Sequence, residues 1–302
     1  MVKNLTRLLP ANRTVSGRCF REWRLPRRNV LHGFSFPWPF VPQHIVPGGV
    51  GPPTALMPAR ETEAIILRTF PLGEADRLVS FFGRASGRMR GVAAGARSVK
   101  NRYGSTLSVM SHVQLWYVEK ETRELVRIQQ AELLESLHQS QSDYELSTGL
   151  AIVSEIAESV LPDHEVSEPM FRLMLLTARE VERTADWTLP VSYFVFWTVR
   201  LGGWLPRFDR CAKCGTAFAS QFAYAAAWAD GLFCESCRTS GMRTLRVAAR
   251  SLAERFAGTS LEKLTDLGPA NRAAEELREV CLDWIEHHTE KKLGTRRMLE
   301  TT

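Results

Sequence analysis

The chain has 302 residues, a formal net charge of +6 and a sequence pI of about 9.1, a length that allows two or three domains with sizeable cores. No run of residues approaches the eighteen apolar residues needed to span a bilayer, and no secretory signal is visible, so we exclude a membrane protein and expect the cytoplasm. The charge excess is uneven, because residues 1–57 contribute +7, residues 58–135 contribute +3 and residues 136–302 contribute −4. Local charge, and not the overall pI, must therefore indicate the partner.

The first 57 residues have no sustained periodicity of apolar side chains. They hold eight of the fifteen prolines of the chain, which oppose both helices and paired strands. We expect residues 1–57 to be a disordered extension, or a segment upstream of a true start at Met57.

A series of short apolar runs separated by turn residues follows. Five such runs within about 70 residues are typical of a small closed barrel, and the OB-fold is the five-stranded case. We therefore predict an OB-fold DNA-binding domain over residues 58–137, with strands at residues 64–67, 78–82, 88–93, 113–118 and 125–128.

Basic residues are segregated within this predicted barrel. No acidic residue occurs between Asp76 and Glu119, whereas cations and one aromatic residue occur in and around the Gly-flanked loop 95–104. Phosphates attract cations, and single-stranded bases stack on exposed rings. The alternatives are a solvated cationic face and, for Phe81 and Phe82, rings in a core. The predicted DNA-binding residues are Arg84, Arg88, Arg90, Arg97, Lys100, Arg102 and Tyr103.

Residues 138–299 have a helical pattern. A capping box at Ser142–Glu145 predicts the start of one helix, and Ser167 is the predicted N-cap of the next. A third helix at about 190–201 is apolar on nearly all sides, so we place it at the centre of a bundle. Residues 247–256 and 271–290 predict two further helices that pack back on this bundle.

Two C-x2-C pairs interrupt the helical pattern. They are Cys211–Cys214 and Cys234–Cys237, and 19 residues separate them. This spacing is typical of a four-thiolate Zn²⁺ site, in which a closed tetrahedral shell leaves no position for substrate. Disulfides or a redox pair are the alternatives. We predict one structural Zn²⁺ in a zinc finger over residues 207–240, inserted in the helical domain.

Sequence patterns of several enzyme classes are missing. The chain has no Gly-x-x-x-x-Gly-Lys phosphate loop and no Gly-x-Ser-x-Gly elbow. An H-x-E triplet at residues 288–290 follows the cysteines, which is the wrong order for a zinc deaminase. We expect a protein that is not an enzyme and has no catalytic residues.

Taken together, these motifs resemble the RecO family of bacterial recombination mediators over about residues 60–299. No single motif is decisive, but their order along the chain is specific. The matching segments are Glu63–Leu67, Leu72–Arg77, Gly95–Arg97, Gly203–Pro206, Cys211–Gly215 and Gly231–Cys237.

The resemblance implies an α+β fold, with an N-terminal OB-fold five-stranded barrel followed by an α-helical domain that carries the four-cysteine zinc finger. It implies binding of single- and double-stranded DNA, annealing of complementary strands, and work with RecR and the C-terminal tail of single-strand-binding protein to load RecA, in the cytoplasm at the nucleoid. Ala94 and Asn101 depart from the family pattern, which often has Lys and Ser there.

Two other functional classes remain open at this stage. One is a zinc-finger regulator or scaffold that binds duplex DNA by sequence and does not anneal strands; it needs a groove-reading helix, and we find none. The other is a metalloenzyme, which needs an open zinc position or a fifth ligand.

Overall fold

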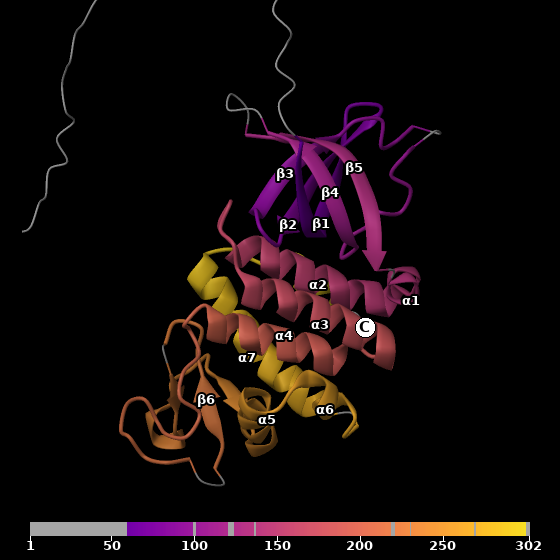
Figure 1. Cartoon of the computed structure of the whole chain (residues 1–302). Coiled ribbons are helices and arrows are strands. Elements are labelled where there is room, and N and C mark those ends of the chain that lie inside the picture. Colours follow the sequence, from indigo (N-terminus) through magenta and orange to yellow (C-terminus); the bar gives the residue numbers. More distant parts are fainter. Residues whose placement is uncertain are drawn as a thin grey trace, which may run out of the picture. The chain divides into compact units, whose positions relative to one another are not determined.

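The structure is a computed structural model that describes residues 59–98, 101–119, 124–135, 137–218, 221–229, 231–268 and 270–299 (Figure 1). The predicted N-terminal extension, residues 1–57, lies outside the described residues.

Five strands close into a barrel in the order β1-β2-β3-β5-β4. All neighbouring strands pair antiparallel except β3 and β5, which pair parallel. This confirms the predicted five-stranded barrel, although β1 and β5 extend well beyond the predicted runs. The strands are β1 Arg60–Leu72, β2 Asp76–Gly83, β3 Gly87–Ala93, β4 His112–Val118 and β5 Val126–Glu135.

The barrel has one buried face inside and another against the helices. Ile66 and Phe81 belong to the core of the barrel, whereas the neighbouring Ile65 and Phe82 belong to the core of the helical part. Phe82 lies 5.8 Å from the ring of Phe171 on helix α3. Burial on both faces explains why residues 64–67 of β1 form a continuous apolar run, without the alternation of apolar and polar residues.

The helical part begins directly after β5. Its longer helices are amphipathic or fully apolar, and two have side-chain N-caps. Asp143 caps α2 by accepting the amide of Leu146 at 3.0 Å, so the predicted capping residue Ser142 is wrong by one position. Ser167 caps α3, as predicted. The helices are α1 His138–Ser142, α2 Tyr144–Val160, α3 Glu168–Thr184, α4 Thr188–Leu201, α5 Val247–Gly258, α6 Leu261–Thr265, α7 Asn271–Thr289 and α8 Arg296–Leu299.

Helix α4 lies at the centre of the bundle, as its apolar sequence predicts. It packs against α3 and α7, and eleven of its fourteen residues are buried. The predicted helices at 247–256 and 271–290 correspond to α5 and α7, and both pack back onto α4. None of the described helices is long and apolar enough to cross a membrane.

A small β module lies in the chain between α4 and α5. Its strands β6 Ala223–Ala225, β7 Leu232–Phe233 and β8 Arg243–Leu245 form one sheet in the order β7-β6-β8. The indole of Trp284 on α7 donates a hydrogen bond of 3.1 Å to the carbonyl of Ala226, which fixes the module to the bundle.

A partly buried carboxylate of α2 holds the C-terminal segment. Glu155 of α2 accepts the backbone amides of Gly294 and Thr295, each at 2.9 Å. Burial by itself would raise the pKa of Glu155, but the hydrogen bond from the Thr295 hydroxyl, the two backbone amides and the charge of Arg68 together lower it below its ordinary value of 4.5. Ionised Glu155 therefore holds the segment between α7 and α8 against α2.

This arrangement predicts that acid releases the segment. Because the folded-state pKa lies below the unfolded value, the stabilisation is fully present above about pH 4.5 and is lost as the pH falls through the folded pKa. We expect hydrogen-exchange protection of the Gly294 and Thr295 amides to fall several-fold between pH 6 and pH 3.5, after correction for intrinsic rates. In Glu155→Gln, protection should already be low at pH 6 and nearly independent of pH. Constant protection in the unaltered chain would contradict the prediction.

Candidate metal centre and cationic surface

The four cysteines of the two C-x2-C pairs meet at one point. Their sulfur atoms all lie within 4.8 Å of one another, and those of Cys214 and Cys234 are 3.6 Å apart. Four thiolates around a tetrahedral ion with metal–sulfur bonds of about 2.3 Å would be about 3.8 Å apart. The cluster therefore has the donor set and the spacing to hold one metal ion.

Local backbone geometry forms this cluster. Within the first pair, the Gly215 amide donates to the carbonyl of Cys211 at 2.9 Å, which closes a tight turn. The Cys237 amide donates to the carbonyl of Cys234 at 3.0 Å in the second pair. A hydrogen bond of 2.8 Å from Ala212 to Leu232 joins the two turns. The short β strands thus bring both pairs together.

The thiols differ in acidity. The Cys214 and Thr216 side chains are 3.2 Å apart at Sγ and Oγ1, and hydrogen bonding with Thr216 lowers the pKa of Cys214 to about 6. Hydrogen bonding with the sulfur of Cys234, together with burial, raises the pKa of Cys237 to about 12. By contrast, burial in the bundle raises the pKa of the isolated Cys281, which marks it as a core thiol.

Two of the predicted DNA-binding arginines lie at the joint between barrel and helices. Arg84 donates to Glu168 of α3 at 2.8 Å and to Glu63 of β1 at 2.9 Å. Arg88 is buried, and it donates to the carbonyl of Glu158 at 2.7 Å and pairs with Asp163 at 2.8 Å. The donors of Arg84 are taken by carboxylates, and Arg88 is held at the joint, so neither presents its charge freely on the surface.

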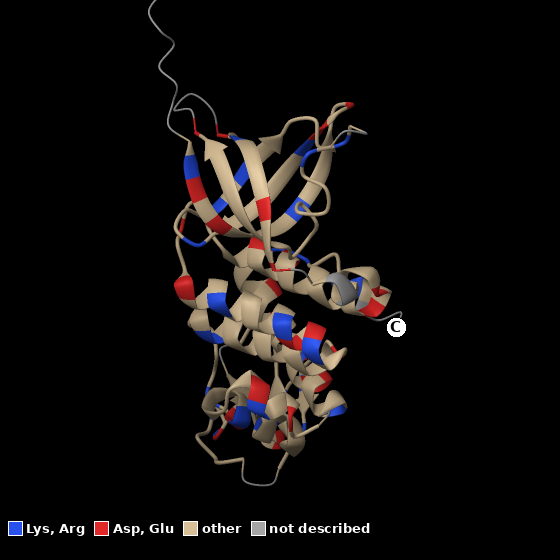
Figure 2. Ribbon diagram, turned by 45° about the vertical axis from the view of Figure 1, so that its right-hand side comes forward, with Lys and Arg blue, Asp and Glu red and all other residues tan. Residues whose placement is uncertain are grey.

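Three other predicted arginines are exposed. Arg90 lies on β3, and it has no ion pair with any residue that the structure describes. Arg97 donates to the carbonyl of Gly73 at 2.7 Å, and Arg102 lies 5.0 Å from the ring of Tyr103. Figure 2 shows basic positions along the strands and loops of the barrel, with acidic positions also present there and on the helices. Lys100 lies outside the described residues.

The rings predicted to stack on bases are not accessible. Tyr103 is only 2% exposed, belongs to the barrel core and donates its hydroxyl to the carbonyl of Ile128 at 3.0 Å. The prediction of an exposed ring at Tyr103 is therefore wrong, because the loop folds its ring inward. Phe81 and Phe82 are both fully buried, which agrees with the alternative that they are core residues.

Sequence reasoning missed an exposed ring on the same barrel. Phe70 lies near the end of β1 and is 43% exposed. Arg68 and Phe70 are two residues apart on one strand, so both lie on the same face of the sheet. This pattern of a cation and a ring could have indicated that Phe70 is exposed.

Comparisons with known proteins agree with this architecture. Residues 57–137 match the family model described as Recombination protein O N terminal, and residues 141–297 match Recombination protein O C terminal. The DNA repair protein RecO of Koribacter versatilis is 34% identical over 241 residues, which cover 80% of this chain and 98% of the relative. Those of Syntrophobacter fumaroxidans and Bifidobacterium longum are 29% and 28% identical, over 81% and 79% of this chain and 98% of each relative.

Both family models match in the order of the barrel and the helical part, and together they cover most of the chain. The N-terminal match coincides with the closed five-stranded barrel, which is an OB-fold. The chain belongs to the RecO family of DNA repair proteins.

Proposed function

We propose that this protein is a non-enzymatic mediator of DNA repair and recombination. It binds single- and double-stranded DNA by the backbone and anneals complementary strands in the cytoplasm at the nucleoid. With RecR, and through the tail of single-strand-binding protein, it helps to load RecA on coated DNA. Membership of the RecO family carries this proposal, and the exposed cations of residues 77–118, a segment of the barrel domain without acidic residues, support it.

Phosphate recognition by cations explains the activity without bond chemistry. Arg90, Arg97 and Arg102 are exposed on the barrel and its loops, and each phosphate contact releases counterions. Phosphates carry no base information, so the held strand keeps its bases free to pair. A strand held in this way can meet its complement without any group having to make or break a covalent bond.

We also propose that the ion of the cysteine cluster is Zn²⁺. Zinc has no redox chemistry and accepts four thiolates tetrahedrally, which fits a cluster that leaves no open coordination position. The ion would fold the β module that lies between α4 and α5, and it would take no part in DNA chemistry.

Removing three cations tests the DNA-binding proposal. Changing Arg97, Lys100 and Arg102 together to Ala should make the plot of log affinity against log salt shallower by about 2 for a random-sequence single strand. The loss should be similar for different sequences, and the annealing rate of complementary strands should fall with it. Fluorescence anisotropy and strand-annealing assays measure both.

A matched triple variant controls for charge alone. Arg172, Lys263 and Arg272 are exposed on the helices and have no ion pair within the described part of the chain, so their change to Ala removes the same charge from elsewhere. This variant should keep the salt slope and the annealing rate. Equal slopes in all three proteins would refute the loop 95–104 as a DNA-binding surface. The same assays on a chain that begins at Met57 test whether residues 1–56 are dispensable.

A further inference from the structure

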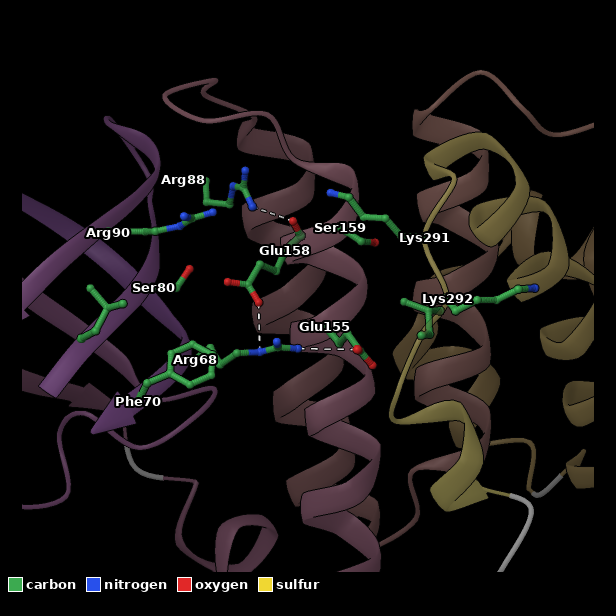
Figure 3. Close-up of a pocket in the computed structure, with 12 residues that line it drawn as sticks. Arg68, Phe70, Ser80, Arg88, Arg90, Glu155, Glu158, Ser159, Lys291 and Lys292 are labelled. Carbon is green, nitrogen blue, oxygen red and sulfur yellow. Dashed lines mark hydrogen bonds and ion pairs between the residues drawn. The ribbon is translucent and has the colours of Figure 1, made fainter. Parts of the chain in front are cut away.

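A cleft of about 390 Å³ lies between the outer face of the barrel and helix α2 (Figure 3). Strands β1, β2 and β3 form one wall, and α2 and the segment after α7 form the other. The site therefore draws residues from both halves of the chain.

The strand register places three polar side chains side by side on the barrel wall. Ser80 of β2 is directly opposite Arg68 of β1 on one side and Arg90 of β3 on the other. Neighbouring strands are about 4.8 Å apart, so one hydroxyl lies between two guanidinium groups. Lys291 faces this row from the opposite wall (Figure 3).

The two acidic residues of the cleft share one arginine as their ion-pair partner. Arg68 pairs with Glu158 at 3.0 Å and with Glu155 at 3.5 Å, and Glu155 also accepts two backbone amides. Arg90 and Lys291 have no carboxylate partner among the described residues. The cleft thus has two cations available for an anionic ligand.

The barrel wall also holds polar atoms that lack a partner. The hydroxyl of Ser80 and Nε of Arg88 are buried and have no hydrogen-bond partner within the described residues, while the two residues are only 3% and 8% exposed. Unpaired buried donors are costly and uncommon in folded proteins. Both residues line the cleft, so an oxyanion bound there would satisfy them.

An apolar surface adjoins this polar row. Phe70 and Leu78 are paired across β1 and β2, and this pair lies two residues along the strands from the pair of Arg68 and Ser80. The ring of Phe70 is 43% exposed, and the guanidinium of Arg68 lies 5.8 Å from its centre. A partly exposed ring beside a phosphate site is the arrangement that holds single-stranded bases.

We propose that this cleft binds one nucleotide of a DNA single strand. The phosphate is held by Ser80, Arg90 and Lys291 with Nε of Arg88, and the base stacks on Phe70. This proposal rests on the proposed DNA-binding function and deepens it, because it extends the path of the strand from the barrel to the segment after α7.

Single substitutions in the full chain test the cleft, with fluorescein-labelled dT20 as the probe. Phe70→Ala should weaken binding at least about fivefold at every salt concentration, because stacking involves no counterion release. Lys291→Ala should make the salt slope shallower by about 0.7, the value for one phosphate contact on a single strand. Ser80→Ala should weaken binding without changing the slope.

Two matched variants serve as controls. Tyr144→Ala removes a ring that is 70% exposed at the start of α2, and Lys263→Ala removes an exposed cation on α6. Both should bind dT20 like the unaltered chain, and circular dichroism should show that every variant is folded.

Failure of the cleft and failure of the proposed function give different results. If the unaltered chain does not bind dT20, the proposed function is wrong. If it binds, and only the changes at Arg97, Lys100 and Arg102 weaken binding, the cleft proposal alone is overturned. It is also overturned if the cleft variants keep their affinity for dT20 and lose affinity for a labelled ten-residue polyglutamate, because the cleft would then take an acidic peptide.

Discussion

Replacing Cys211 or Cys237 with Ser is expected to abolish metal binding and to unfold the β module between α4 and α5. The strands of this module are only two or three residues long, which is too short for a sheet to be stable by itself. In zinc-finger peptides the metal contributes roughly 10–16 kcal/mol of apparent binding free energy, and this is also folding free energy. Loss of one ligand should therefore cost several kcal/mol and lower the melting temperature of the whole helical part.

The effect should reach the bundle through named contacts. Trp284 of α7 donates to Ala226 of the module, and the ring of Phe208 lies 6.4 Å from that of Trp284. Native mass spectrometry should find one metal ion per unaltered chain and none in Cys237→Ser. A cobalt-substituted sample should show a spectrum typical of four sulfur ligands.

Cys281→Ala provides the control. Cys281 is a fully buried thiol of α7 outside the cluster, so its removal should leave metal content at one ion per chain. A folded, metal-free chain with an unchanged melting temperature would show that the cluster is not a structural metal site.

Replacing Gly87 with Ala is expected to destabilise the joint between the barrel and the helices by about 3 kcal/mol or more. Gly87 has φ of +73°, which costs an L-residue about 1–2 kcal/mol. A Cβ atom there would also lie 2.5 Å from the backbone carbon of His164 and 2.6 Å from the amide nitrogen of Glu165. Because these are backbone atoms, the segment after α2 must move away.

That movement breaks a second set of contacts. The His164 amide donates to the carbonyl of Arg88 at 2.9 Å, and Asp163 pairs with the guanidinium of Arg88. Displacing the segment loses both interactions along with the fit at Gly87. Thermal unfolding and hydrogen exchange at the His164 amide measure the loss.

Gly73→Ala separates the backbone cost from the clash. Gly73 has φ of +60°, but no atom lies within 4 Å of the position of its Cβ. This variant should lose only the 1–2 kcal/mol of the left-handed conformation. If the two variants melt at the same temperature, close packing at Gly87 contributes nothing to the joint.

Local features of this chain could be predicted from its sequence. The two C-x2-C turns close within four residues each, so their spacing was enough to predict the clustered thiols. The position of α4 at the centre of the bundle could also be predicted from local sequence. Its residues are apolar on nearly all sides, and a helix without a polar face must be buried on all sides.

Long-range pairings could not be predicted. Nothing near Arg84 or Arg88 in sequence shows that their partners Glu168 and Glu158 lie on α3 and α2. The sequence pattern is identical for a cation that holds a phosphate and one that holds a distant carboxylate. Lys291 likewise joins the cleft only because the segment after α7 returns to α2, and a single sequence without known contacts gives no sign of this.

The central position of α4 has a consequence for synthesis on the ribosome. Helix α7 covers one side of α4, but residues 202–270 separate the two in sequence. At about 5–20 residues per second, residues 202–289 take roughly 4–18 seconds to emerge after α4 is complete. During that interval a helix that is apolar on nearly all sides lacks its main cover. The nascent chain is therefore most prone to aggregation in this window, and early metal capture by the cysteine pairs would compact the intervening chain before α7 arrives.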